Sequence, residues 1–155
     1  MNCGLWLRIA PLVAVAALAG GCGPEPPAPT RTMEISGELR LPADITPAGK
    51  VHVTLFHAWA LTGNLRHPLE PIETFEAAPG PFTHRFSYPE GVGEGLIVYV
   101  WADVDGDGVQ CTPTVRTDPS GLTEVAGFPA DSARVVVNLT EACRGANWFY
   151  PPAPG

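Results

Sequence analysis

Alternation of apolar residues is the feature that most constrains this chain. Between residues 32 and 150 the apolar side chains recur at every second position, in short segments separated by proline, glycine and aspartate, and no helical stripe is found. A repeat of two places successive side chains on opposite faces of a strand, so that one face can be buried. The pattern therefore predicts an all-β domain.

Six to seven short strands are expected. They are predicted at residues 35–41, 50–57, 72–77, 82–88, 96–102, 122–125 and 135–139. The segment 96–102 is apolar on both faces, which is typical of a central strand covered on both sides. Strands of this number and length in about 120 residues predict an antiparallel two-sheet sandwich, Ig-like or transthyretin-like, over residues 32–150.

Four segments follow one another in a recognisable order along the chain: Ser36-Gly37-Glu38-Leu39, residues 51–56, His84-Arg85-Phe86 and residues 97–108. Together they resemble the transthyretin-like or carboxypeptidase-regulatory-like β-sandwich of many bacterial surface lipoproteins. The family's usual Pro-Gly-x-Tyr approach to the central strand is replaced by the glycine-rich segment 90–95. The resemblance implies a non-catalytic accessory or adhesion module, and it implies no substrate. The Pro-rich tail 151–155 departs from the Tyr-Arg-Gly-Ser ending of the family's hydrolase branch.

The first 22 residues predict export. Arg8 precedes an apolar run over residues 9–18 and the small residues Ala19-Gly20-Gly21, after which comes Cys22. About ten apolar residues are too few to span a hydrocarbon core of roughly 30 Å, which argues against a transmembrane anchor. The segment resembles a bacterial lipoprotein signal, so we expect residues 1–21 to be removed and Cys22 to be acylated and held in the lipid bilayer. Ordinary secretion is the alternative.

A proline-rich tether follows the predicted cleavage point. Residues 22–31 include four prolines, which favour extended polyproline II and cannot build a core. The residue after Cys22 is Gly23 rather than Asp, which by resemblance to lipoproteins of diderm bacteria implies the outer membrane rather than the inner one. The expected location is therefore the bacterial cell envelope.

The net charge excludes one class of partner. The chain has a formal charge of −7, and removal of Arg8 with the signal makes it −8. Such a balance argues against nucleic acid and against direct binding to anionic headgroups.

Two cysteines, Cys111 and Cys143, remain after processing besides Cys22. Because an exported chain meets an oxidising compartment, we expect them to form a disulfide. The chain-entropy model gives such a cross-link roughly 3.5 to 4 kcal/mol of stabilisation. A metal-thiolate pair is the alternative, but no His or Cys lies nearby in sequence at a suitable spacing.

The clearest chemical motif is Asp103-Val104-Asp105-Gly106-Asp107-Gly108. Carboxylates at alternate positions bring oxygens toward one point, as a Ca²⁺ loop does. The expected ligands are Asp103, Asp105, Asp107, the carbonyl of Val109 and, from a distant turn, Asp118. A structural Ca²⁺ is therefore predicted; the alternative is a charged turn without metal, since Asp and Gly favour turns.

A second functional class is a module that binds glycans or envelope proteins through exposed aromatic side chains. The candidates are Trp59, Trp148 and Tyr150, although the aromatic tail can equally fold back over the sheet, and Trp101 is expected in the core. The histidines do not form a catalytic group, because His52 and His57 lie on opposite faces of one strand. We therefore predict no enzyme.

Overall fold

The computed structural model describes residues 27–61, 65–91 and 95–149, with the side chains of 59–70, 147 and 148 left out. The signal segment and Cys22 lie outside the described residues. The strands are β1 (Thr30–Arg40), β2 (Val51–Leu61), β3 (Leu65–Ala77), β4 (Gly80–Pro89), β5 (Gly95–Ala102), β6 (Pro119–Glu124), β7 (Ser132–Asn138) and β8 (Glu141–Ala142). A 3₁₀ turn, η1 (Ala146–Phe149), follows β8.

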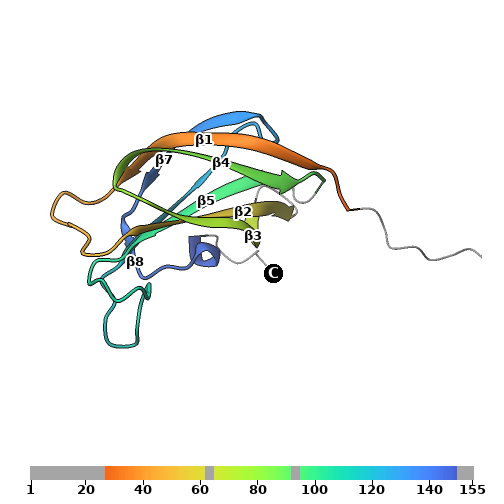
Figure 1. Cartoon of the computed structure of the whole chain (residues 1–155). Coiled ribbons are helices and arrows are strands. Elements are labelled where there is room, and N and C mark those ends of the chain that lie inside the picture. Colours follow the sequence, from red (N-terminus) through yellow and green to blue (C-terminus); the bar gives the residue numbers. More distant parts are fainter. Residues whose placement is uncertain (1–26, 62–64, 92–94, 150–155) are drawn as a thin grey trace, which may run out of the picture.

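The strands form two packed sheets, which confirms the predicted all-β sandwich (Figure 1). One sheet has the order β4-β1-β7 and the other the order β3-β2-β5-β6-β8. The strand predicted to be central, β5, is the middle strand of the five-stranded sheet. Among the described helical residues, none form a segment both long and apolar enough to span a membrane.

One strand pair departs from the antiparallel prediction. β1 and β7 run parallel, with Ile35 opposite Ala133 and Leu39 opposite Val137, whereas the other pairs are antiparallel. The chain reaches β7 by crossing from β6 in the other sheet. Since no hairpin joins β1 to β7, the turn does not impose an antiparallel direction.

The core lies between the sheets and follows the predicted alternation. In β2 the side chains of Val51, Val53 and Leu55 are fully buried, and β1 and β7 contribute inward residues in the same way. The buried residues of the core cluster are Met33, Ile35, Leu39, Val51, Val53, Leu55, Phe86, Tyr88, Leu96, Val98, Val100, Ala102, Val125, Val135, Val137 and Leu139. Each large aliphatic side chain among them stabilises the fold by about 1.5–3 kcal/mol.

Two strands begin earlier than the alternation indicates. β3 starts at Leu65 rather than near residue 72, because it is an edge strand, where Pro68 and Pro71 do not remove hydrogen bonds that a central strand needs. β1 starts at Thr30, which pairs with Pro89, so ordered structure begins slightly before the predicted domain boundary at residue 32.

Candidate metal centre

The aspartate-rich loop connects β5 to β6 at one end of the sandwich. In Figure 1 this segment (teal) lies at the end opposite the start of β1. The segment that precedes β2 runs beside it: Asp103 donates its N–H to the carbonyl of Lys50 (3.0 Å), and Gly49 donates to the carbonyl of Asp103 (2.9 Å). These backbone bonds fix where Asp103 leaves β5.

Asp103 is the most constrained carboxylate of the loop. Its side chain is buried, and its two oxygens accept hydrogen bonds from the N–H of Gly106 (2.7 Å) and of Gly108 (3.0 Å). Both glycines have positive φ, 82° and 73°, which lets the backbone curl around the carboxylate without the strain that an L side chain would meet. The loop thus wraps around one of its own anionic groups.

Gly49 is required where the two segments meet. A Cβ at this position would lie 2.3 Å from Oδ2 of Asp103, well inside van der Waals contact. Only glycine therefore lets the segment before β2 approach the buried carboxylate without displacing it.

Asp118, at the other end of the loop, lies against the start of the aspartate-rich segment. Its side chain is 1% exposed, and Oδ1 accepts a hydrogen bond from the N–H of Val104 (2.9 Å). Burial raises the pKa of Asp118, and the neighbouring charges of Asp105, Asp103 and Asp107 raise it further, while the bond from Val104 acts in the opposite direction. Keeping the carboxyl of Asp118 ionised in the folded protein therefore costs electrostatic free energy.

Three of the predicted ligands come together. One carboxylate oxygen each from Asp103, Asp105 and Asp118 lies within 4.8 Å of the others. Two oxygens bound to one Ca²⁺ at about 2.4 Å are separated by at most about 4.8 Å, so this spacing suits a shared cation. Asp118, distant in sequence, thus lies beside two of the other predicted ligands.

Asp107, the remaining predicted carboxylate ligand, is arranged differently. Asp107 does not belong to the group of three; it is exposed, and its Oδ1 accepts a hydrogen bond from the N–H of Val109 (2.7 Å). The side chain of Val109 is 51% exposed. Asp107 therefore serves to close the turn after the site, as Asp105 does with the N–H of Asp107 (3.1 Å).

The predicted disulfide is present beside this loop. Cys111 and Cys143 are bonded with a Cα–Cα distance of 5.6 Å, and they link the loop to the segment that follows β8. We call residues 143–149 the strap. The strap crosses the outer face of the five-stranded sheet, where Phe149 meets Tyr99 edge-on at a centroid distance of 6.3 Å.

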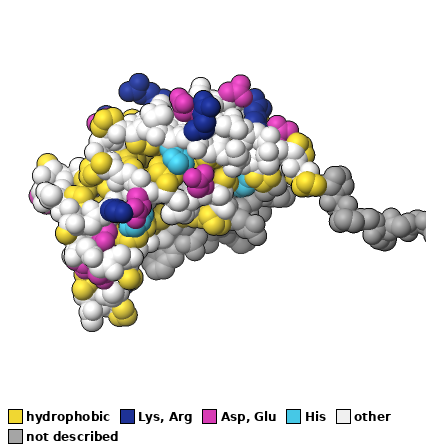
Figure 2. Space-filling view, viewed as in Figure 1, with side chains coloured by type: hydrophobic (Ala, Val, Ile, Leu, Met, Phe, Trp, Pro, Cys, Tyr) yellow, Lys and Arg dark blue, Asp and Glu magenta, His cyan; other side chains and the backbone are white. Residues whose placement is uncertain are grey.

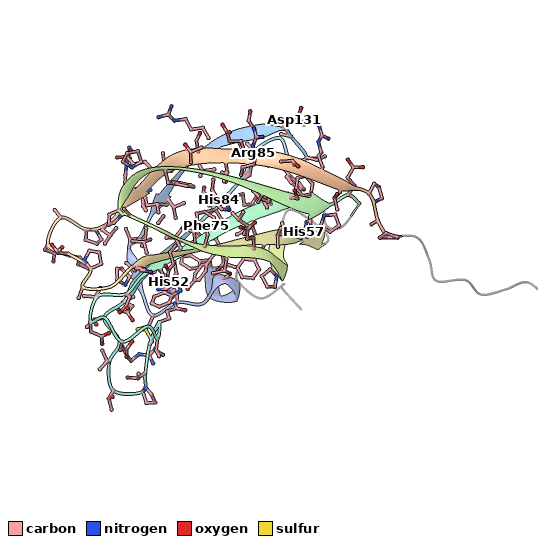
Figure 3. The ribbon with its side chains drawn as sticks, viewed as in Figure 1. His52, His57, Phe75, His84, Arg85 and Asp131 are labelled. Atoms are coloured by element: carbon pink, nitrogen blue, oxygen red, sulfur yellow. A yellow bond between two sulfur atoms is a disulfide. The ribbon has the colours of Figure 1, made fainter. Side chains whose placement is uncertain are left out.

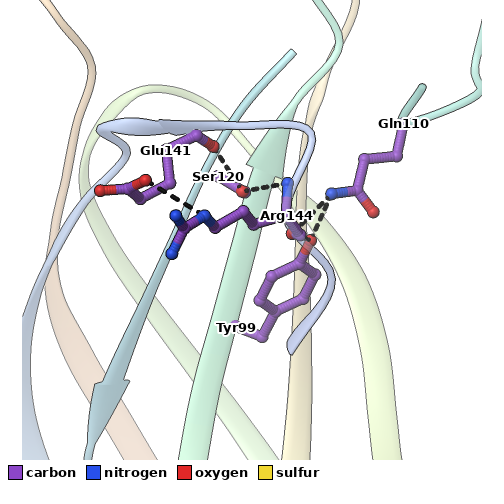
Figure 4. Close-up of polar contacts among 5 residues, drawn as sticks. All are labelled: Tyr99, Gln110, Ser120, Glu141 and Arg144. Atoms are coloured by element: carbon purple, nitrogen blue, oxygen red, sulfur yellow. Dashed lines mark hydrogen bonds and ion pairs between the residues drawn. The ribbon is translucent and has the colours of Figure 1, made fainter. Parts of the chain in front are cut away.

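Polar contacts hold the strap in place (Figure 4). The hydroxyl of Tyr99 donates to the carbonyl of Arg144, and Gln110 donates to the same carbonyl (2.8 Å). Ser120 donates to the carbonyl of Glu141 (2.7 Å) and accepts from the N–H of Arg144. Burial raises the pKa of Tyr99 to about 12, so this hydroxyl keeps its proton at any physiological pH.

The aromatic residues differ from expectation. The side chains of Trp59 and Trp148, and all of Tyr150, lie outside the described residues. Trp101 is not in the core as predicted: it is half-buried on the outer face, where it stacks on His52 with centroids 4.2 Å apart and ring planes 13° apart. The inward positions of β5 belong to the alternate residues, so Trp101 must face outward.

The histidines are spread over the molecule (Figure 3). His57 is buried at the end near the start of β1, and burial lowers its pKa; within the described part of the chain its ring nitrogens have no hydrogen-bond partner. His84 stacks on Phe75 and lies 2.9 Å from Glu73. His52 lies at the opposite end from His57, so they do not form a shared site.

Comparisons with known proteins returned no match: no family model, no curated protein and no solved structure is similar to this chain at a significant level.

Proposed function

We propose that this protein is a lipid-anchored β-sandwich module of the bacterial cell envelope, without catalytic activity, and that a structural Ca²⁺ stabilises its distal end. The observation that supports the anchor is the order of Arg8, the apolar run 9–18 and Cys22 in the sequence. The resemblance to transthyretin-like lipoprotein domains is part of the same proposal, and the two-sheet fold is compatible with it.

The calcium proposal is supported by three facing carboxylates, of which Asp103 and Asp118 are buried and Asp105 is exposed. Asp103 and Asp118 are 3% and 1% exposed, so water screens their mutual repulsion poorly. A divalent cation within reach of both and of Asp105 offsets that repulsion. Asp103, Asp105 and Asp118 would hold the ion, with carbonyls or waters completing its shell. The role of the ion would be structural, because the same loop leads directly to Cys111 and the disulfide.

The arrangement of the ends supports an outward-facing module. β1 begins where the tether of residues 22–31 would deliver the chain, and the aspartate-rich loop lies at the other end of the sandwich (Figure 1). The proposed metal and the disulfide would therefore strengthen the end that faces away from the membrane.

Lipid labelling tests the anchor. Cells that express the full chain are grown with a labelled fatty acid, and the protein is recovered from membrane and soluble fractions. Wild type is expected to incorporate label and to sediment with membranes. Cys22→Ser is expected to lose the label while retaining the leader, whereas Cys3→Ser is expected to behave as wild type because Cys3 precedes the apolar run. An unlabelled, soluble wild-type protein would refute the anchor.

A further inference from the structure

A groove lies on the outer face of the five-stranded sheet, next to the aspartate-rich loop. One depression of about 310 Å³ is lined by Lys50, His52, Glu76 and the loop residues Asp103 and Asp107. A second of about 440 Å³ continues it toward residues 77–79. The two share Gly49, Lys50 and Glu76, so together they form one elongated groove.

Strand register explains how the groove is built. Glu76 of β3 pairs with His52 of β2, and His52 pairs with Trp101 of β5, so three neighbouring side chains stand in a row on the outer face. His52 and Trp101 stack face to face with ring centroids 4.2 Å apart. The result is an aromatic pair beside a carboxylate.

An ion pair crosses the groove and is open to solvent. Lys50 and Glu76 form a salt bridge, yet their side chains remain 65% and 48% exposed. Such an exposed pair is worth little to the fold, about 0–1 kcal/mol, and its donors and acceptors remain able to bind a ligand. Asp107 at the loop end is also exposed.

We propose that this groove binds a neutral oligosaccharide. Sugar rings present apolar C–H faces, which pack on aromatic rings, and pairs of hydroxyls, which bind carboxylates and ammonium groups. The groove offers both kinds of contact, from His52 backed by Trp101 and from Glu76, Lys50 and Asp107. Its length over two joined depressions suits a chain of sugar units rather than one ring.

The charge of the groove selects against anionic ligands. Glu76, Asp103 and Asp107 are set against Lys50 alone among its lining residues. Figure 2 shows basic and acidic side chains interleaved along the three-stranded sheet, and acidic side chains also toward the end with the aspartate-rich loop. An extended peptide is a weaker fit, because peptides add to sandwiches along an unpaired strand edge, whereas this groove lies on a sheet face.

Affinity electrophoresis tests the site. The purified full-length protein is run through gels that contain laminarin, galactomannan or pullulan, which are neutral, or alginate, which is anionic. Wild type is expected to be retarded by at least one neutral polysaccharide and not by alginate. Loss of a hydrogen bond to a charged group lowers affinity by about tenfold to a hundredfold, so Glu76→Gln and Lys50→Met should migrate faster.

Control variants separate the site from the fold. Glu34→Gln removes one exposed carboxylate on the other sheet and should be retarded as wild type is. Each gel is repeated with chelator, because Asp103 lines the groove but the contacts proposed for the sugar come from His52, Lys50, Glu76 and Asp107. Retardation that persists with chelator supports the groove even if the calcium proposal fails. Absence of retardation by all three neutral polysaccharides, or retardation by alginate alone, would overturn the proposal.

Discussion

Removal of the disulfide tests whether the strap depends on its covalent link. The double variant Cys111→Ser, Cys143→Ser opens a loop with a sequence separation of 32 residues. For a loop of this length the chain-entropy model gives about 3.7 kcal/mol at 25 °C. In a domain of about 120 residues, this loss corresponds to a fall in the melting midpoint of roughly 15 °C.

Equilibrium unfolding in urea measures this loss directly. The variant should show a lower midpoint and a slope equal to or slightly above that of wild type, because the unfolded chain without the cross-link exposes as much surface or more. Wild type treated with reductant should fall to the level of the variant, and the variant should not respond to reductant. A second readout follows the strap: proteolysis near Arg144 should accelerate more than proteolysis elsewhere, since the carbonyl of Arg144 is held by Tyr99 and Gln110.

A loss below about 1 kcal/mol would refute the reasoning. It would mean that the unfolded chain is already restricted without the cross-link, so that the disulfide removes little of its conformational entropy.

Three further predictions concern single side chains. Gly49→Ala should destabilise the domain by about 1–3 kcal/mol in thermal melts, because the new Cβ displaces the buried carboxylate of Asp103. The control is Gly127→Ala, where a Cβ meets no other atom, so this variant should show only the smaller cost of the positive φ at that position. Burial lowers the pKa of folded His57 below the ordinary 6.5. The stability of the domain is therefore complete above pH 6.5, and below it the free energy of unfolding falls by up to about 1.4 kcal/mol per pH unit, because the unfolded chain takes up the proton more readily. His57→Phe should reduce this loss of stability at low pH, and an unchanged pH dependence would contradict the assignment. Tyr99→Phe should cost about 1 kcal/mol in urea, because Gln110 still binds the carbonyl of Arg144; no loss would show that this hydroxyl contributes nothing.

The strand pattern predicted the fold well where burial is one-sided. In β1, β2 and β7 one face meets the core, so alternation identifies the inward residues directly. β5 was identified as central because it is apolar on both faces, and the strap explains why its outer face needs apolar residues: it covers Tyr99. The same pattern misplaced Trp101, because β5 is apolar on both faces and its sequence does not indicate which face meets the core.

Long-range placement accounts for the other differences. The parallel pairing of β1 with β7 depends on a crossover between sheets, which leaves no local signal. Alternating aspartates predicted a common site, and Asp118 was expected to complete it from a distance; the structure brings Asp118 there but leaves Asp107 outside the group. The row of Glu76, His52 and Trp101 comes from three strands, so no spacing within one segment could identify it.

The most direct test of the proposed structural Ca²⁺ is a thermal melt of the oxidised protein with excess Ca²⁺ and with chelator. At a hundredfold excess over Kd, the metal should add about 2.7 kcal/mol, or a rise in midpoint of about 10 °C. Asp105→Asn should abolish the rise, because Asp105 belongs to the facing group; Asp107→Asn removes the same charge from the same loop and should retain it. A melting midpoint that Ca²⁺ does not change, or a Ca²⁺-dependent rise that persists in Asp105→Asn, would contradict the proposed structural Ca²⁺. The loop would then be a charged turn without metal.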